Sequence, residues 1–367
     1  MGRLLQCRTG ADDWVDRIAA DLDNAREALA WAAATEDSCT ALAIGPTLLR
    51  ALPASQHAER MALAERCRTM IGPAVPERLQ QRTWSQLSLA WMNSNHKRSH
   101  EAARRAVDLA RAMQPREQDK FALYLALSSF AGMAAHLGES KEAEEALCEM
   151  RALEDPAWPP QRVMWGVSAE GNVASFLGKV DEALEHVKRL VTVNRARGAD
   201  RLAGSEALNS LVDAQLGAGN AAEAARLGAE IVAGLEGTRH ECQLAYARLN
   251  LAAALLVLGN CAQARLVAQA GWPQAARFEL QPYWADHLAL LAALERRPRA
   301  AAKLAGYADA ANSGEDIREP NEAAAIDKAR RIVREALGDE VFERLHIQGT
   351  SLLEGDFARI LFAAEDA

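Results

Sequence analysis

Glycines that recur at a nearly constant interval constrain the fold of this chain more than any other feature. The four glycines are Gly138, Gly178, Gly219 and Gly259, which lie 40, 41 and 40 residues apart, and each is followed five positions later by an alanine. The same spacing extends backward to Arg98–Ala103 and forward to Arg297–Ala302. Such self-similarity indicates a stack of repeated units, because one small unit cannot bury its apolar face alone, whereas stacked copies can.

Each repeated unit is predicted to be a pair of helices joined by a glycine-containing turn. Glycine reaches the positive φ that a tight turn after a helix needs, and the small alanine lets the second helix approach the first closely. Half of the residues are apolar while aromatic residues make up only 5%, and alanine, which favours helix, supplies much of the apolar share. The sequence therefore predicts an all-α fold, a right-handed superhelical solenoid of antiparallel helix pairs with a period of about 40 residues.

Prolines and glycines predict the remaining segmentation. Proline inside a helix costs about 3 kcal/mol, so prolines are expected in the connections between units. Those assigned to connections are Pro73, Pro76, Pro115, Pro156, Pro159, Pro160, Pro273 and Pro282. We expect a flexible arm over residues 1–10, a repeat array over 11–320 that opens with a helix over 13–34, and a C-terminal helical cap over 321–367. The cap should break into two or three helices at Gly338 and Gly349.

The net charge, the cysteine spacing and the lack of a long apolar segment disfavour several classes of function. The longest apolar run, residues 249–258, is interrupted by Asn250 and is far shorter than the roughly 20 residues of a spanning helix. The N-terminus has no signal-peptide pattern. We therefore expect a cytoplasmic protein without membrane contact. A formal charge of -8 disfavours direct nucleic-acid binding. The six cysteines show no C-x-x-C spacing, so reduced structural thiols are expected.

The turn glycine and the alanine five residues later resemble tetratricopeptide repeats, although a period near 40 exceeds their usual length of about 34 residues. Both ends of the chain are similar to a more specific family, the helical sensor region of bacterial multidomain signalling ATPases. The opening stretch matches that family's pattern at Trp14, Arg17, Ile18, Asp23, Asn24, Arg26, Ala28, Leu29, Trp31 and Ala32. The closing stretch matches it at Pro298, Ala301, Ala302, Leu304, Gly306, Leu337, Gly338, Phe342 and Gly349.

This resemblance implies a sensor region that normally follows a winged-helix or cyclase domain and a nucleotide-binding ATPase domain. The phosphate-binding loop of such an ATPase is not found in this sequence. Its only Gly-Lys pair, Gly178 and Lys179, is followed by Val180 and has no glycine five residues before it. We therefore expect no ATPase activity, no cofactor and no direct promoter contact.

Catalytic patterns occur only as incomplete matches, so no enzyme is expected. His240 and Glu241 begin a zinc-protease-like string, but Leu244 stands where the second histidine should be. The stretch over residues 166–171 misses the nucleophile-elbow spacing by one residue.

One pair of histidines has the spacing of metal ligands. His96 and His100 are four residues apart, which on a helix places two imidazoles on one face, and Glu101 lies beside them. The pair falls across a predicted turn, however, where polar residues are ordinary. We expect solvated turn residues and no metal site.

Polar and aromatic residues of the first helices are the candidates for binding, because first helices line the concave surface of tetratricopeptide stacks. Counting back from the turns gives Ser128, Trp165, Ser168, Asn172, Glu206, Asn209, Asp213, Tyr246, Trp284 and His287. Asn172, Asn209 and Asp213 matter most, because amide and carboxylate groups hydrogen-bond a peptide backbone or a small polar ligand. The alternative is that each is solvated or bonded to the next helix.

A local excess of positive charge is a second candidate surface. It comprises Arg78, Arg82, Lys97, Arg98, Arg104, Arg105 and Arg111, against only Glu101 and Asp108 in the same span. Such a patch would receive an acidic partner surface or a phosphorylated ligand through charge-assisted hydrogen bonds. The alternative is an ordinary solvated basic face.

Together these features predict a non-catalytic sensor module of a bacterial transcriptional or signalling regulator. It would bind a protein, a peptide or a small-molecule effector through the concave face of the solenoid. The alternative is a structural scaffold that assembles complexes, or forms a homodimer, through its convex face or its ends.

Overall fold

The computed structural model describes residues 21–52, 56–92, 95–116, 120–196, 205–238, 240–278, 280–312, 318–363 and 366. Within these ranges the regular structure is helical, with 18 α-helices, one short 3-10 helix η2 (Gln114–Arg116) and no strand. The predicted all-α class is confirmed. The chain divides into two compact units, residues 1–204 and 205–367.

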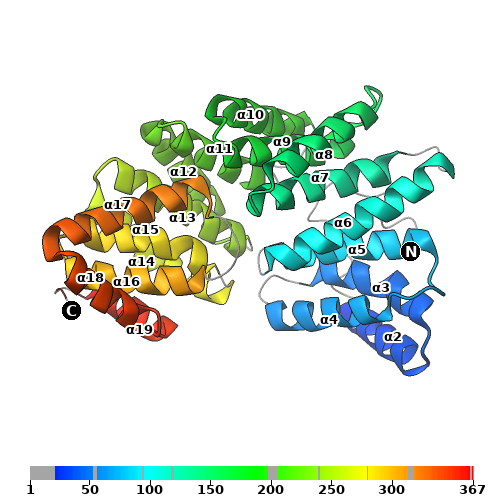
Figure 1. Cartoon of the computed structure of the whole chain (residues 1–367), viewed down its shortest axis with the longest axis horizontal. Coiled ribbons are helices and arrows are strands. Elements are labelled where there is room, and N and C mark those ends of the chain that lie inside the picture. Colours follow the sequence, from blue (N-terminus) through cyan, green and yellow to red (C-terminus); the bar gives the residue numbers. More distant parts are fainter. Residues whose placement is uncertain are drawn as a thin grey trace. The chain divides into compact units, whose positions relative to one another are not determined.

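The first unit contains nine described α-helices, coloured blue to green in Figure 1. They are α2 (Leu22–Ala34), α3 (Ser38–Ala51), α4 (His57–Met70), α5 (Glu77–Trp91), α6 (His96–Met113), α7 (Phe121–His136), α8 (Ser140–Leu153), α9 (Pro160–Phe176) and α10 (Val180–Ala196). The predicted arm over residues 1–10, and the start of the helix predicted over 13–34, lie outside the described residues.

The second unit contains the other nine α-helices. They are α11 (Ser205–Gly217), α12 (Ala221–Leu235), α13 (Glu241–Val257), α14 (Cys261–Arg277), α15 (Gln281–Leu294), α16 (Pro298–Ala311), α17 (Pro320–Leu337), α18 (Asp339–Gly349) and α19 (Glu354–Phe362). The last three fall in the predicted cap and break at Gly338 and Gly349. In the structure they pack against α14, α15 and α16 as part of the same compact unit.

The turn glycines adopt the conformation that the repeat predicts. Gly138, Gly178, Gly219 and Gly259 have φ values of 74°, 68°, 78° and 75°. Each turn closes with the same two backbone bonds; after α7, for example, the Gly138 amide donates to the Ala135 carbonyl and the Glu139 amide to that of Ala134. This pattern is the Schellman motif, which needs a left-handed residue after the helix and thereby explains the repeating glycine.

The last turn of this kind has no glycine. Between α15 and α16 the left-handed residue is Arg296, with φ of 61°, and the Arg297 amide donates to the Ala292 carbonyl. The match predicted at Arg297 is therefore one residue late, and Ala301 rather than Ala302 stands five residues after the turn. Because Arg296 carries a Cβ atom, this turn is more strained than the glycine turns.

The predicted unit before Gly138 is also displaced along the chain. The structure begins α6 at His96, with Asn95 as its N-cap, so Ser99 takes the place in α6 that Ala143 takes in α8. The match at Arg98–Ala103 therefore lies about one helical turn too late. Both Ser99 and Ala143 are fully buried, which is why a small residue is needed at this place.

Helix pairs stack in the way that tetratricopeptide-like repeats do. Within each unit, first helices contact the next first helix, as α7 contacts α9 and α13 contacts α15, while second helices contact the first helices on either side. Buried apolar residues form one core in the second unit, from α13 to α19 with α12 packed against it, and two cores in the first unit. In each unit we call the surface of its first helices, α5, α7 and α9 in the first unit and α11, α13 and α15 in the second, the first-helix face of that unit.

The expectation that prolines avoid helix interiors is wrong at one assigned position. Pro273 lies inside α14, and Pro46, which was not assigned to a connection, lies inside α3. Pro160 and Pro282 instead occupy the first turns of α9 and α15, where a missing amide hydrogen costs nothing.

The motif residues near the N-terminus hold helices together. Arg26 of α2 donates two hydrogen bonds to the Glu59 carboxylate of α4, at 2.7 and 3.0 Å, and a third to Asp23 at 2.8 Å. Leu29 of the same motif is buried, whereas Trp31 is 63% exposed. Arg26 and Glu59 therefore tie α2 to α4, while Asp23 binds Arg26 from within α2.

Close backbone contact fixes the cap to the repeats. Gly306 of α16 and Gly349 of α18 face each other; a Cβ atom at Gly306 would collide with the His346 carbonyl, and one at Gly349 with that of Lys303. The α19 helix is held by Arg297, which donates to the carbonyls of Ile360 at 3.0 Å and Leu361 at 2.7 Å. Both glycines belong to the closing motif, whose spacing thus reflects packing.

No helix in the described parts of the chain combines the length and the apolar character needed to cross a bilayer.

Candidate functional site

The binding candidates in the first unit differ in exposure. Ser128 of α7 is buried and donates to the Leu125 carbonyl of its own helix at 2.8 Å, so it does not face outward. On α9, Trp165 and Ser168 are half-buried and Asn172 is exposed. The α9 surface is therefore where these candidates reach solvent.

In the second unit two asparagines join neighbouring first helices. Asn209 of α11 is buried, and its amide donates to the Gln243 carbonyl of α13 at 3.2 Å. Asn250 of α13 donates in return to the Asn209 carbonyl at 3.1 Å. The side chain of Glu206 lies outside the described parts of the structure. The Asn209 side chain is therefore bonded to the next first helix, as the alternative interpretation of this residue expects.

The aromatic candidates of the second unit lie on α13 and α15. The Tyr246 ring lies 6.3 Å from that of Tyr283, and Tyr246 is half-buried. Trp284 is fully buried, and its Nε1 atom has no hydrogen-bond partner. Its ring packs where a Cβ atom on Gly271 of α14 would stand. Trp284 is therefore a core residue.

Two predicted candidates, Asp213 and His287, are covered by the start of α17. The Asn321 amide donates to the Asp213 carboxylate of α11 at 2.5 Å and to the Asp213 carbonyl at 3.1 Å. Glu322 lies 3.4 Å from Nε2 of His287 on α15, measured from its Oε1 atom. The cap thus folds onto the first-helix face of its own unit, and no pattern in the sequence predicts this contact.

Burial controls the protonation of this cluster. Removal from water, reinforced by the Asp213 carboxylate, raises the pKa of Glu322 to about 8. Burial likewise raises the pKa of Asp213 and of Glu319, and it lowers that of His287. At neutral pH Glu322 is protonated and His287 is neutral, because charging either group inside the fold is unfavourable. We call Asp213, His287, Glu319 and Glu322 the acidic cluster.

An ion-pair network beside the acidic cluster connects α15, α16, α17 and α18. Arg318 donates to the fully buried Asp286 at 2.9 Å and to Asp309 at 2.6 Å. Arg330 and His346 also contact Asp309, at 2.6 and 2.7 Å. Although burial works to raise it, these hydrogen bonds hold the pKa of Asp309 below its usual range. Asp309 is thus the centre that joins the cap to the last repeat.

Three of the seven residues in the predicted basic patch pair with acidic side chains. Arg98 lies 3.6 Å from Glu65, Arg104 lies 2.7 Å from Glu142, and Arg111 pairs with Glu149 at 2.5 Å. Arg82 donates to the Thr47 hydroxyl at 2.9 Å. Arg78, Lys97 and Arg105 are exposed. Glutamates of α4 and α8, distant in sequence, therefore offset much of the local excess of charge.

The expectation that His96 and His100 are solvated turn residues is wrong. Both belong to α6, and His100 is 5% exposed with its ring stacked on Phe130 at 4.9 Å. The His96 ring instead stacks on His136 at 4.8 Å, and burial lowers the pKa of His136 to about 3.

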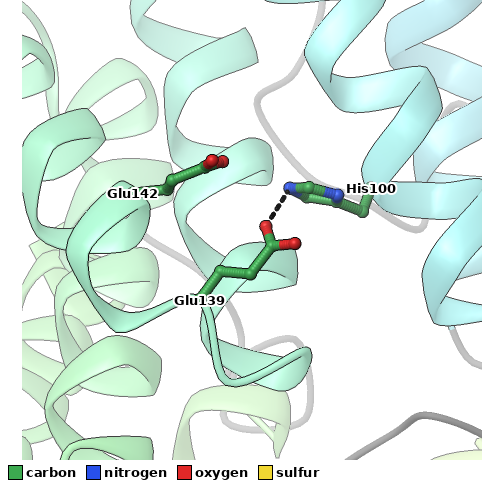
Figure 2. A group of neighbouring side chains, drawn as sticks. All are labelled: His100, Glu139 and Glu142. Carbon is green, nitrogen blue, oxygen red and sulfur yellow. Dashed lines mark ion pairs between the residues drawn. The ribbon is translucent and has the colours of Figure 1, made fainter.

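His100 lies beside two glutamates that are distant from it in the sequence. Glu139 and Glu142, at the start of α8, point toward it, and Nε2 of His100 lies 3.1 Å from Oε2 of Glu139 (Figure 2). One donor atom from each of the three lies within 4.8 Å of the others. Burial lowers the pKa of His100, although Glu139 works in the opposite direction, so the imidazole favours its neutral form.

Fold comparison places the chain among tetratricopeptide-like helical solenoids. A Rap protein in complex with Competence and Sporulation Factor aligns with a TM-score of 0.56 and 12% identity, covering 94% of this chain and 98% of its own. The sensor-bearing Signal Transduction ATPase with Numerous Domains from Pyrococcus horikoshii aligns at 0.52 and 14%, covering 85% of this chain. This chain spans about half, 51%, of that protein. No family model matches the sequence, and no curated protein matches it either.

A third solved structure is less similar. Aspartyl phosphate phosphatase F from Bacillus subtilis aligns over 92% of this chain with a TM-score of 0.48 and 10% identity.

Proposed function

We propose that this chain is a non-catalytic, partner-binding sensor module of a bacterial signalling or transcriptional regulator. Support comes from a shared fold with a Rap protein that holds a bound factor and with the repeat sensor of a signal-transduction ATPase. Repeat solenoids present extended surfaces to peptides and proteins, which suits such a role. The partner is a protein or peptide.

The proposed location of the binding surface rests on one difference between the two units: two candidate side chains are covered in the second unit, and one is exposed in the first. In the second unit, Asp213 already contacts Asn321 of α17, and His287 already contacts Glu322 of the same helix. On α9 of the first unit, by contrast, Asn172 is exposed. Amide side chains in this position pair with a peptide backbone. The proposed binding surface is therefore the first-helix face of α7 and α9.

The test is partner capture with surface variants. Tagged wild-type protein and the Asn172→Arg variant are used to isolate partners from the source cells. A true partner is captured by the wild type, lost with Asn172→Arg, and then bound by the purified wild type in calorimetry. The matched control is Lys141→Glu on second helix α8, where the lysine side chain is 89% exposed; it should retain capture. A partner lost equally in both variants, or in neither, contradicts the proposed surface.

Assembly is the second candidate function, favoured by apolar side chains on the surface of the second unit. Leu266, Ile347 and Leu353 are 66%, 66% and 74% exposed. Apolar side chains of this size at the surface mark association sites when they are contiguous. Light scattering coupled to size exclusion gives the mass directly. A dimer that Leu353→Lys dissociates would favour the assembly role, whereas a monomer at all concentrations would remove it.

A further inference from the structure

We propose that His100, Glu139 and Glu142 form a binding site for a divalent transition-metal ion, with Zn²⁺ as the best fit. The three side chains come from second helices, His100 from α6 and the two glutamates from the start of α8, and they converge on one point (Figure 2). Their donor atoms lie within 4.8 Å of one another. Imidazole together with carboxylates is a ligand set that Zn²⁺ accepts readily.

The distance between His100 and Glu139 is that of two side chains bound to one metal ion, and the two atoms do not form a hydrogen bond. Nε2 of His100 and Oε2 of Glu139 are 3.1 Å apart. Both atoms are buried, and neither has a hydrogen-bond partner. Such atoms are costly to bury unless something else satisfies them. Two ligands bonded to a tetrahedral ion at 2.0–2.1 Å lie roughly 3.3 Å apart, so an ion fits between them with little movement.

The surroundings of His100 orient its ring for this role. The ring stacks on Phe130 of α7 at 4.9 Å, and the residue is only 5% exposed. An imidazole held in one orientation pays little entropy when it binds a metal ion. Glu139 and Glu142 are three residues apart across the first turn of α8, which places both carboxylates on one side of the helix. Three protein ligands leave a fourth position for water or for a group of a partner.

Arg104 is the built-in competitor of the proposed ion. Its guanidinium lies 2.7 Å from Glu142 and 3.9 Å from Glu139. The Arg104 side chain is 49% exposed, so it can move into solvent when an ion takes the carboxylates. Metal binding and the Arg104 pair therefore exclude each other, and this competition separates a metal site from a simple ion-pair cluster.

The test is a Zn²⁺ titration of the untagged full chain by competition with a chromophoric chelator. We expect one Zn²⁺ per chain. His100→Ala should weaken binding by at least about tenfold, the smallest effect expected when even an outer-shell partner of a metal ligand is lost. Arg104→Gln should strengthen it, because the competing charge is gone. His240→Ala, a histidine of the second unit, is the matched control and should leave the affinity unchanged.

Helix content by circular dichroism verifies that each variant folds. If His100→Ala does not fold, the Arg104→Gln titration and the d–d spectrum of bound Co²⁺, which reports nitrogen and oxygen ligation, decide the question. Stoichiometric binding that Arg104→Gln strengthens supports the site. No binding by either the wild type or Arg104→Gln overturns it, as does binding that His100→Ala leaves intact.

Discussion

Replacement of Glu322 by glutamine tests the protonation of the acidic cluster. Glutamine keeps the shape of a protonated glutamic acid, with one donor and one acceptor available to His287, but it never ionises. Burial raises the pKa of Glu322 from its ordinary value of 4.5 to about 8. The folded protein therefore holds this proton between about pH 4.5 and pH 8, where the unfolded chain has lost it.

The sign of the effect follows from proton linkage. Because the folded state binds more protons than the unfolded state in this window, the free energy of unfolding falls as the pH rises toward 8. Each unit of pKa shift corresponds to about 1.36 kcal/mol, so the loss is at most on the order of 5 kcal/mol. Burial also raises the pKa of Asp213 and of Glu319. Part of the pH-dependent loss of stability therefore belongs to these two carboxyl groups, and the share of Glu322 alone is smaller.

Urea unfolding followed by circular dichroism at pH 5, 7 and 8.5 measures the difference between wild type and Glu322→Gln. The two proteins should agree within about 1 kcal/mol at pH 5, where Glu322 is protonated, and the variant should become more stable as the pH rises. Glu335→Gln, an exposed position of the same helix, removes the same charge and is the control. A difference between wild type and Glu322→Gln that stays constant with pH would refute the reasoning.

Two further predictions concern the repeat turns and the cap. Arg296→Gly should raise the free energy of unfolding by about 1 kcal/mol in urea, because glycine relieves the left-handed strain, whereas Gly259→Ala should lower it; equal effects in both would contradict the turn assignment. Gly306→Ala should cost ~3 kcal/mol, because the added methyl group meets the α18 backbone, while Gly234→Ala in open space should be neutral or stabilising; equal stability of the two variants would show that α16 and α18 do not touch.

The repeat architecture could be predicted from the sequence because its physical cause is local. A Schellman turn requires a left-handed residue, so the glycines stand out in the sequence, and a close helix crossing requires a small residue five positions later. Arg296 was misplaced by one residue, because nothing in its chemistry favours the conformation that the neighbouring helices impose. Pro273 was assigned to a connection, although α14 continues through it.

The polar clusters could be predicted only in part, because they depend on contacts between distant segments. Asp213 was identified as a first-helix residue, but its partner Asn321 lies 108 residues away. A usable pattern was nevertheless present. Glu322 lies in the buried stripe of α17, three residues before Ala325, and His100 lies in that of α6, three residues before Ala103. A titratable residue inside an apolar stripe therefore indicates a cluster without naming its partners.

The contact between Gly306 and Gly349 bears on how an array of this kind can change length. Repeat proteins grow or shrink when a whole helix pair is duplicated or deleted, since each pair contacts only its neighbours. A pair inserted within the first unit preserves every contact that the cap makes in the second unit, including the one between α17 and α11. A pair inserted after α16 instead separates the two glycines and removes the backbone surface on which α18 rests. Recombination can thus lengthen this protein from within, while its last helix pair and its cap must be inherited together.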